Sequence, residues 1–66
     1  MQIKETTSTE TQVSIRGEHT FEDGTKVSFE MVRGTIWRQW GAPEYYLKHA
    51  YEKSERLIFD WLERQG

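Results

Sequence analysis

Sixty-six residues without cysteine make room for one small domain that has neither disulfides nor cysteine-based zinc sites. The net charge of −2, from eleven acids and nine bases, argues against a non-specific nucleic-acid binder, which needs a clear excess of basic residues. The first residues lack the apolar segment of a signal peptide, and no apolar run approaches the roughly 18 residues of a membrane span. We therefore expect a cytoplasmic domain, which agrees with the lack of cysteine.

The first ten residues are polar and rich in threonine, and two interpretations of them remain open. Such a composition at a terminus is typical of a disordered tail. Threonine is also β-branched and favours strands, and the odd-numbered threonines share the parity of Val13 and Ile15. In that second interpretation the segment extends the first strand backward. The threonines concerned are Thr7, Thr9 and Thr11.

Residues 11–31 alternate between polar and apolar side chains with the period of two that is typical of half-buried strands. Two such runs flank Glu22-Asp23-Gly24, which is a strong signal for a hairpin turn. The register of this hairpin decides whether the two runs share one face of a sheet. Their inner faces consist of Val13, Ile15, His19, Phe21, Val27, Phe29 and Met31.

The length of the turn sets that register. A two-residue turn would point the two apolar sets to opposite faces, which a half-buried sheet does not tolerate. A three-residue turn closes instead on Phe21 and Thr25, and Gly24 then takes the left-handed conformation of a G1 bulge. We therefore predict the facing pairs His19–Val27, Gly17–Phe29 and Ile15–Met31.

Residues 32–40 allow two continuations of the sheet. A second three-residue turn, Val32-Arg33-Gly34, would start a third strand at Thr35 and set Trp37 beside Phe29. Alternatively, the second strand continues to about Trp40 and pairs with the threonine-rich N-terminal segment. Because valine is an unfavourable turn residue, both continuations remain open.

The last third of the chain predicts one amphipathic helix from about Pro43 to Gln65. Proline suits a first helical turn, where its missing donor is not needed. A wide apolar stripe follows, and on the opposite side charged residues four apart alternate in sign from Glu44 to Arg64. The stripe consists of Tyr46, Leu47, Ala50, Tyr51, Ser54, Leu57, Ile58, Trp61 and Leu62.

The two histidines do not indicate catalysis or metal binding. His19 lies on the inner face of the predicted hairpin, where a buried, hydrogen-bonded role is expected, and His49 projects from the charged side of the helix. No serine or carboxylate can be placed beside His19 from the sequence. There is also no glycine-rich phosphate loop and no metal-ligand spacing. We predict no catalytic residues, no cofactor and no metal site.

Segment 33–40 combines two tryptophans and two arginines, which are enriched at interface hot spots. In a regular strand Trp37 and Trp40 point to opposite faces, because one is odd-numbered and the other even-numbered. One of them therefore lies outward beside Arg38. On the helix, a phenylalanine outside the apolar stripe marks a second candidate contact. The candidate interaction residues are Arg33, Trp37, Arg38, Trp40, Phe59 and Leu62.

Together these patterns predict an α+β domain over residues 1–66. An antiparallel hairpin or three-stranded meander (about 11–40) precedes one long helix (about 43–65) that packs on one sheet face. The core is small and the aromatic residues exceed what one helix-on-sheet layer needs, which favours a homodimeric protein–protein interaction module, a small regulator or inhibitor. The alternative is a nucleic-acid-binding domain, of transcriptional or RNA-handling type, that stacks bases on segment 33–40.

Overall fold

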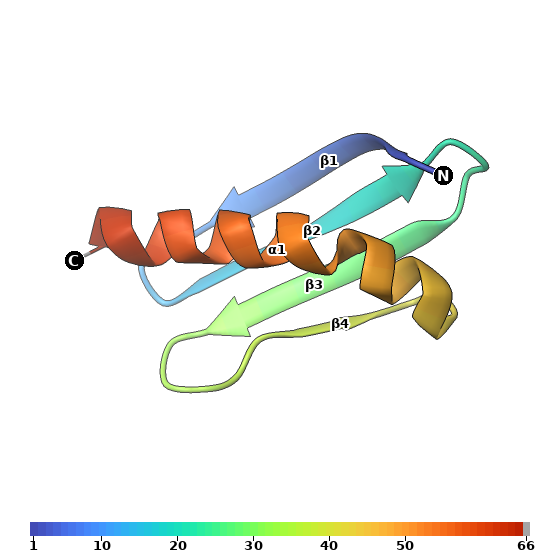
Figure 1. The fold of residues 1–66 in the computed structure, drawn as a ribbon. Coiled ribbons are helices and arrows are strands. Elements are labelled where there is room, and N and C mark those ends of the chain that lie inside the picture. Colours follow the sequence, from blue (N-terminus) through green and yellow to red (C-terminus); the bar gives the residue numbers. More distant parts are fainter. Residues whose placement is uncertain (66) are drawn as a thin grey trace.

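Four antiparallel strands and one helix make up residues 1–65, the part of the chain that the computed structural model describes. The sheet follows chain order, with β1 (Ile3–Glu10), β2 (Ser14–Phe21), β3 (Lys26–Val32) and β4 (Arg38–Trp40). Helix α1 (Glu44–Gln65) lies obliquely across one face, here called the inner face; the opposite, outer face is left uncovered by residues 1–65 (Figure 1). The predicted α+β class is confirmed. No helix in this part of the chain is long and apolar enough to span a membrane.

The β2–β3 hairpin has the predicted register. The Phe21 amide donates to the Thr25 carbonyl oxygen at 2.8 Å, and Gly24 has a φ of 90°. The burial pattern of the two runs was therefore sufficient to select the length of the turn, because only one length places both apolar sets under the helix. The predicted facing pairs all occur: His19–Val27, Gly17–Phe29 and Ile15–Met31.

The threonine-rich N-terminal residues form β1, which pairs with β2 instead of extending it. A turn at Thr11–Ser14 reverses the chain and sets Thr6 opposite His19. Because of this reversal, Thr6 and not the odd-numbered threonines is drawn to the inner face. The expected inward position of Val13 is also wrong, since Val13 lies in the turn and is exposed.

The connection between β3 and β4 is longer than the predicted three-residue turn. The Thr35 amide donates to the Val32 carbonyl oxygen at 3.0 Å, but β4 begins further along the chain. Gln39, and not Trp37, therefore lies beside Phe29. The pairing of β3 with β4 is therefore shifted by two residues from the predicted register, which keeps each side chain on its expected face. The alternative of one long strand is wrong, because β3 ends at Val32 and the N-terminal segment pairs with β2.

The core lies between α1 and the inner face of the sheet as two apolar clusters. The fully buried polar residue His19 separates the two clusters along β2, and the fully buried Ser54 separates them along α1. The stripe predicted for the helix thus supplies both clusters. One is built from Ile15, Phe29, Ile58 and Trp61, and the other from Phe21, Val27 and Ala50.

The charged side of α1 forms less of an ion-pair ladder than its sequence predicts. Arg56 lies 3.3 Å from Glu52, one turn away. Arg64 leaves the ladder and pairs with Glu10 at the end of β1. The last turn of the helix is therefore tied to the edge strand and not to its own preceding turn.

Candidate interaction surface

A chain of hydrogen bonds crosses the core on the inner face. Nδ1 of His19 lies 2.9 Å from the Thr6 hydroxyl, and Nε2 lies 2.7 Å from the Ser54 hydroxyl. Ser54 in turn donates to Oε1 of Gln39 at 2.7 Å, and Nε2 of Gln39 donates to the Leu47 carbonyl oxygen at 2.9 Å. The network therefore joins β1, β2, β4 and α1.

The direction of these bonds follows from the last of them. The Gln39 amide donates to a carbonyl, so its oxygen accepts the Ser54 hydrogen and Ser54 accepts from Nε2–H of His19. In the neutral ring Nδ1 then accepts from the Thr6 hydroxyl. Burial, with nearby Lys53 as a smaller cause, lowers the pKa of His19 from 6.5 to about 4, and the neutral ring is therefore the stable form at neutral pH.

This geometry is that of a structural network and not of a nucleophilic pair. A nucleophilic serine donates its proton to the histidine, whereas Ser54 donates to Gln39 and is fully buried. The His19 ring also stacks on Phe29, with centroids 4.9 Å apart. The predicted buried, hydrogen-bonded histidine is confirmed. Its partners were missed, although a serine in the middle of an apolar helical stripe was a signal for one of them.

The second histidine lies outside the core. His49 is on the exposed side of α1, where its ring meets the edge of Tyr45 at a centroid distance of 4.6 Å. In the described residues 1–65, no three histidine or acidic side chains gather as they would around a metal ion.

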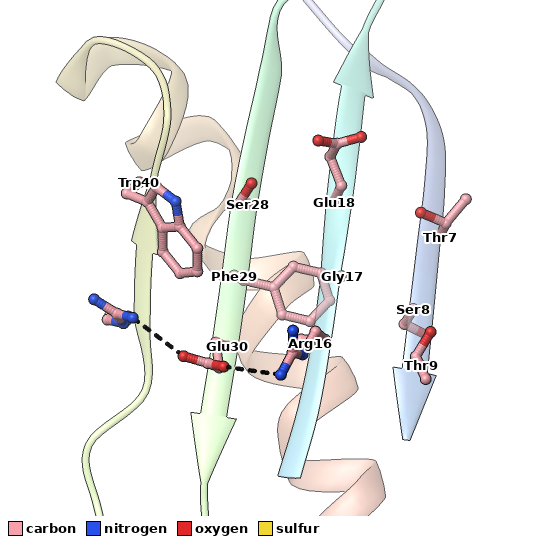
Figure 2. Close-up of a pocket in the computed structure, with 11 residues that line it drawn as sticks. Thr7, Ser8, Thr9, Arg16, Gly17, Glu18, Ser28, Phe29, Glu30 and Trp40 are labelled. Atoms are coloured by element: carbon pink, nitrogen blue, oxygen red, sulfur yellow. Dashed lines mark hydrogen bonds and ion pairs between the residues drawn. The ribbon is translucent and has the colours of Figure 1, made fainter. Parts of the chain in front are cut away.

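The outer face carries two arginines bridged by one glutamate. Glu30 on β3 lies 3.2 Å from the Arg38 guanidinium on β4 and 3.8 Å from that of Arg16 on β2. The Arg38 guanidinium also lies over the Trp40 ring, 4.5 Å from its centroid. Figure 2 shows Trp40 and Glu30 on the same side of the sheet. The ion pair and the cation–π contact hold Arg38 and Trp40 in place without a partner.

A shallow hollow of about 370 Å³ opens on this face (Figure 2). Its floor is the backbone of the facing pair Gly17–Phe29, which directs the Phe29 side chain to the inner face. The neighbouring residues along each strand point outward and form the walls, with Trp40 at one side and β1 at the other. The outward wall residues are Thr7, Thr9, Arg16, Glu18, Ser28, Glu30, Arg38 and Trp40.

The two tryptophans of segment 33–40 part as their parity predicts. Trp40 lies outward with Arg38 and is 43% exposed. Trp37 lies on the helix side, where its ring packs against Tyr51 at a centroid distance of 4.7 Å and covers one apolar cluster. Of this pair, Trp40 is the one available to a partner.

Arg33 ties two turns together instead of joining this surface. Its Nε donates to the Gln12 carbonyl oxygen at 3.0 Å, and its backbone amide donates to Val13 at 2.8 Å. Its guanidinium also lies 5.7 Å from the centroid of the Trp61 ring. These contacts occupy Arg33 within the fold, so we do not assign it to the interaction surface.

The helical candidates are likewise separate from the outer face. Leu62 packs against the core, whereas Phe59 is half exposed beside Glu55 and Asp60. The six candidates therefore do not form one site, and Arg38 with Trp40 is the pair that the fold brings together. Arg16 and Glu30 were missed, although the predicted pair Ile15–Met31 already implies that they face each other one position further along.

Comparison with known proteins yields no match among family models, curated sequences or solved structures. The function is therefore inferred from the surfaces of this chain. On the outer face an exposed tryptophan, two arginines and a hollow coincide, and we take this face as the candidate interaction surface.

Proposed function

We propose that this chain is a small protein–protein interaction module that binds its partner on the outer face of the sheet. The observation that carries the proposal is the exposed Trp40, held against Arg38, which is itself fixed by Glu30. Tryptophan and arginine supply the largest contributions at interfaces, and side chains that are already ordered lose little entropy on binding. A cytoplasmic regulator or inhibitor of a larger protein fits such a surface.

The charges of the surface indicate the chemistry of the partner. Arg16 and Arg38 share one acidic neighbour, Glu30, and Glu18 is paired with Lys26 at 3.7 Å, so one positive charge remains beside Trp40. A partner segment with a carboxylate next to an apolar side chain would match both features, the carboxylate on a guanidinium and the apolar group in the hollow. The proposal assigns no reaction to the protein, because the buried His19 and Ser54 have no access to a substrate.

A capture experiment from the native cell extract tests the surface. The immobilised protein is compared with the double variant Arg38→Ala/Trp40→Ala and with Phe59→Ala, a matched control that removes a half-exposed aromatic ring from the helix. We expect the outer-face variant to lose at least about tenfold in affinity for the captured protein, as hot-spot truncations do, and the control to retain it. Loss in the control alone would contradict the proposal and point to the helix.

We also propose that the module is a homodimer. A chain of this size buries little apolar surface by itself, and Tyr51 and Phe59 remain half exposed. Sedimentation equilibrium over a range of concentrations measures the assembly. A species of 7.9 kDa that persists at the highest concentration would exclude the dimer.

Nucleic-acid binding is the second candidate, favoured by the exposed tryptophan and the two arginines on an open sheet face. Such faces stack single-stranded bases in several folds. The net charge of −2 weakens this candidate, since nucleic-acid binding of this kind needs a clear excess of basic residues. A gel-shift titration with single-stranded oligonucleotides decides between the two: salt-sensitive binding that Trp40→Ala abolishes would favour nucleic acid over a protein partner.

A further inference from the structure

The two edges of the sheet differ in how they exclude a further strand. The edge strand β4 has three residues and is soon followed by Pro43, whereas β1 has eight residues, and no strand of residues 1–65 pairs with its outer edge. In Figure 1, β1 is the outermost strand on its side, and α1 crosses β2 and β3. Natural edges are protected by short strands, prolines, bulges or charged side chains, because open backbone groups otherwise pair with another strand. Its short length protects the β4 edge.

Residues 6–10 of β1 have none of these protections. The irregularity in the pairing of β1 with β2 lies before them, between Ile3 and Glu5, and from Glu5 to Glu10 the register is continuous. Residues 6–9 are uncharged, and Glu10 is already paired with Arg64 of the helix. This part of the edge therefore presents a regular backbone without a free charge to another strand.

The hydrogen bonds of the first turn show which backbone groups are open. The Thr11 amide donates to the Ser14 carbonyl oxygen at 2.8 Å, so Thr11 is bonded toward β2. Bonding alternates along an antiparallel strand, so the odd-numbered residues of this part of β1 face β2 and the even-numbered residues face the open edge. The backbone groups of Thr6, Ser8 and Glu10 are therefore available to a further strand.

On the outer face, an added strand would lie within reach of Arg16. Thr9 faces Arg16, and Arg16 faces Glu30, so the three residues form one row across three strands. The Arg16 side chain is 70% exposed and lies 3.8 Å from Glu30. A residue added opposite Thr9 has its Cα atom about 10 Å from that of Arg16, two strand spacings away. A glutamate there would meet the guanidinium above the short threonine side chain.

On the inner face, the added strand would lie beside Leu57. This side chain is half-buried and packs on the apolar cluster that contains Ile15. Arg64 follows two helical turns later on the same side of α1, and it reaches Glu10 of β1. In Figure 1, the C-terminal half of α1 runs toward the arrowhead of β1. An apolar side chain of the added strand would therefore cover the accessible side of Leu57.

A second copy of β1 does not fit this pattern. Its even-numbered side chains face inward and are polar, so they would leave Leu57 without an apolar neighbour. The half-exposed Tyr51 and Phe59 lie roughly 120° or more around the helix from Leu57, at about 100° per residue. The open edge and the homodimer proposed above therefore use different surfaces.

We propose that the partner adds an extended segment to the open edge of β1 as a fifth strand. The proposal rests on the interaction module proposed above and names the form of its partner. Apolar side chains of the segment face Leu57, and an acidic side chain between them faces Arg16. In strand addition the backbone bonds give affinity and the alternate side chains give specificity. Because Thr7 and Thr9 line the hollow, the segment borders the same outer face that carries Trp40.

Two synthetic peptides test the edge directly. The first is acetylated and amidated Gly-Thr-Val-Glu-Val-Thr-Gly, and the second has lysine in place of the glutamate. Each is titrated into the nitrogen-15-labelled protein and followed by NMR. The glutamate peptide should protect the amides of Thr6, Ser8 and Glu10 from hydrogen exchange, because these amides face the edge. It should also bind about fivefold more tightly than the lysine peptide, as expected for a cross-strand charge pair.

A charge reversal tests the position of the acidic side chain. Arg16→Glu should reverse the preference, so that the lysine peptide binds more tightly than the glutamate peptide. Arg56→Glu is the matched control, since Arg56 is equally exposed on the helix and the change in net charge is the same. The control should keep the wild-type preference. An equal response of the two variants would show a general effect of net charge and contradict the assignment of Arg16.

A proline substitution tests the backbone pairing. Proline is accepted at edge positions whose amide faces away from the sheet, so Ser8→Pro should fold while removing an open donor in the middle of the edge. It should weaken the glutamate peptide at least about tenfold, whereas Ser8→Ala keeps the amide and should bind as the wild type does. Circular dichroism checks the fold of both variants. If Ser8→Pro does not fold, the amide protection and the charge reversal still decide the proposal.

The outcomes separate the edge from the module itself. Wild-type protein that binds neither peptide at millimolar concentration, or Ser8→Pro that folds and binds as tightly as Ser8→Ala, would overturn strand addition. Protection of the same amides in the free protein that grows with its concentration would place a second copy at the edge and also overturn it. None of these results touches the outer-face proposal, which the capture experiment with Arg38→Ala/Trp40→Ala tests separately.

Discussion

The inner and outer faces of the sheet are built from alternate residues of the same strands, yet they differ in chemistry. On the inner face the polar side chains beneath the helix are bonded to one another, as the buried His19 is to Thr6 and Ser54. On the outer face the polar side chains form ion pairs that leave them partly exposed, as with Arg38 and Glu30. The polar side chains of the inner face thus bind one another within the fold, whereas those of the outer face remain available to a partner.

The difference follows from what each face exchanges with water. A buried polar group that loses its partner costs about 1–3 kcal/mol, whereas an exposed ion pair contributes about 0–1 kcal/mol. In residues 1–65, no buried side-chain nitrogen or oxygen lacks a hydrogen-bond partner. Substitutions on the inner face should therefore change stability, and those on the outer face should change binding.

The largest effect on stability is expected at Gly17, which lies against the Phe29 ring and the backbone of β1. An added Cβ would overlap the Thr7 carbonyl oxygen and lie 2.7 Å from Cζ of Phe29. Gly17→Ala should lower the free energy of unfolding by about 3 kcal/mol or more, which is most of the stability of a domain this small. Urea unfolding followed by circular dichroism measures it.

Gly24→Ala is the matched control for this substitution. Unlike Gly17, Gly24 has a positive φ, and an added Cβ there would have no atom within 4 Å, so only backbone strain of about 1 kcal/mol is expected. Equal losses in the two variants would contradict the close approach of β1 to Gly17.

The next effect is a dependence of stability on pH that comes from His19. Its folded pKa of about 4 lies below the ordinary value of 6.5, so the unfolded chain binds more protons between these two values. The contribution of the neutral His19 ring to the free energy of unfolding is complete above pH 6.5. It is lost as the pH falls to 4, in total about 3 kcal/mol. His19→Gln should flatten the loss between pH 7.5 and 5, whereas an unchanged slope would show that other groups cause it.

A smaller effect is expected from Ser54→Ala, which removes one link of the network. The Nε2–H of His19 and Oε1 of Gln39 then lose their shared partner in the core, at a cost of about 2 kcal/mol. Thermal unfolding compares it with Ser28→Ala on the outer face, which should cost about 0.5 kcal/mol or less. Comparable losses at both serines would remove the distinction between the faces.

The smallest effect on stability is expected at Trp40. Trp40→Phe should cost about 1 kcal/mol or less, because the ring is half exposed and the contact with Arg38 lies at the surface. The same variant should lose most of the acrylamide-quenchable tryptophan fluorescence, since Trp61 is fully buried and Trp37 is partly buried. Unchanged quenching would mean that Trp40 is not the accessible indole.

Local patterns predicted the hairpin, its register and the helix. The residues on both sides of Glu22-Asp23-Gly24 alternate with a period of two, and a single turn length buries both apolar sets. The pairing of Gly17 with Phe29 therefore follows from the sequence. The apolar stripe from Tyr46 to Leu62 fits a single continuous helix with one buried side. Residue parity also predicted that Trp37 and Trp40 lie on opposite faces, which places Trp40 and Arg38 on the candidate surface.

The tertiary structure decided what depends on segments far apart in the chain. Polar β1 carries no apolar pattern to set its register, so its pairing with β2, and the inward position of Thr6, follow from the fold alone. Ser54 bonds to both His19 and Gln39 only because α1 crosses the sheet and contacts β2 as well as β4. The sequence by itself determined β2, β3 and α1 and the face that each buries, since burial acts along one strand or helix. Which polar groups become partners depends on distance in space, and the packing of α1 on the sheet decided that.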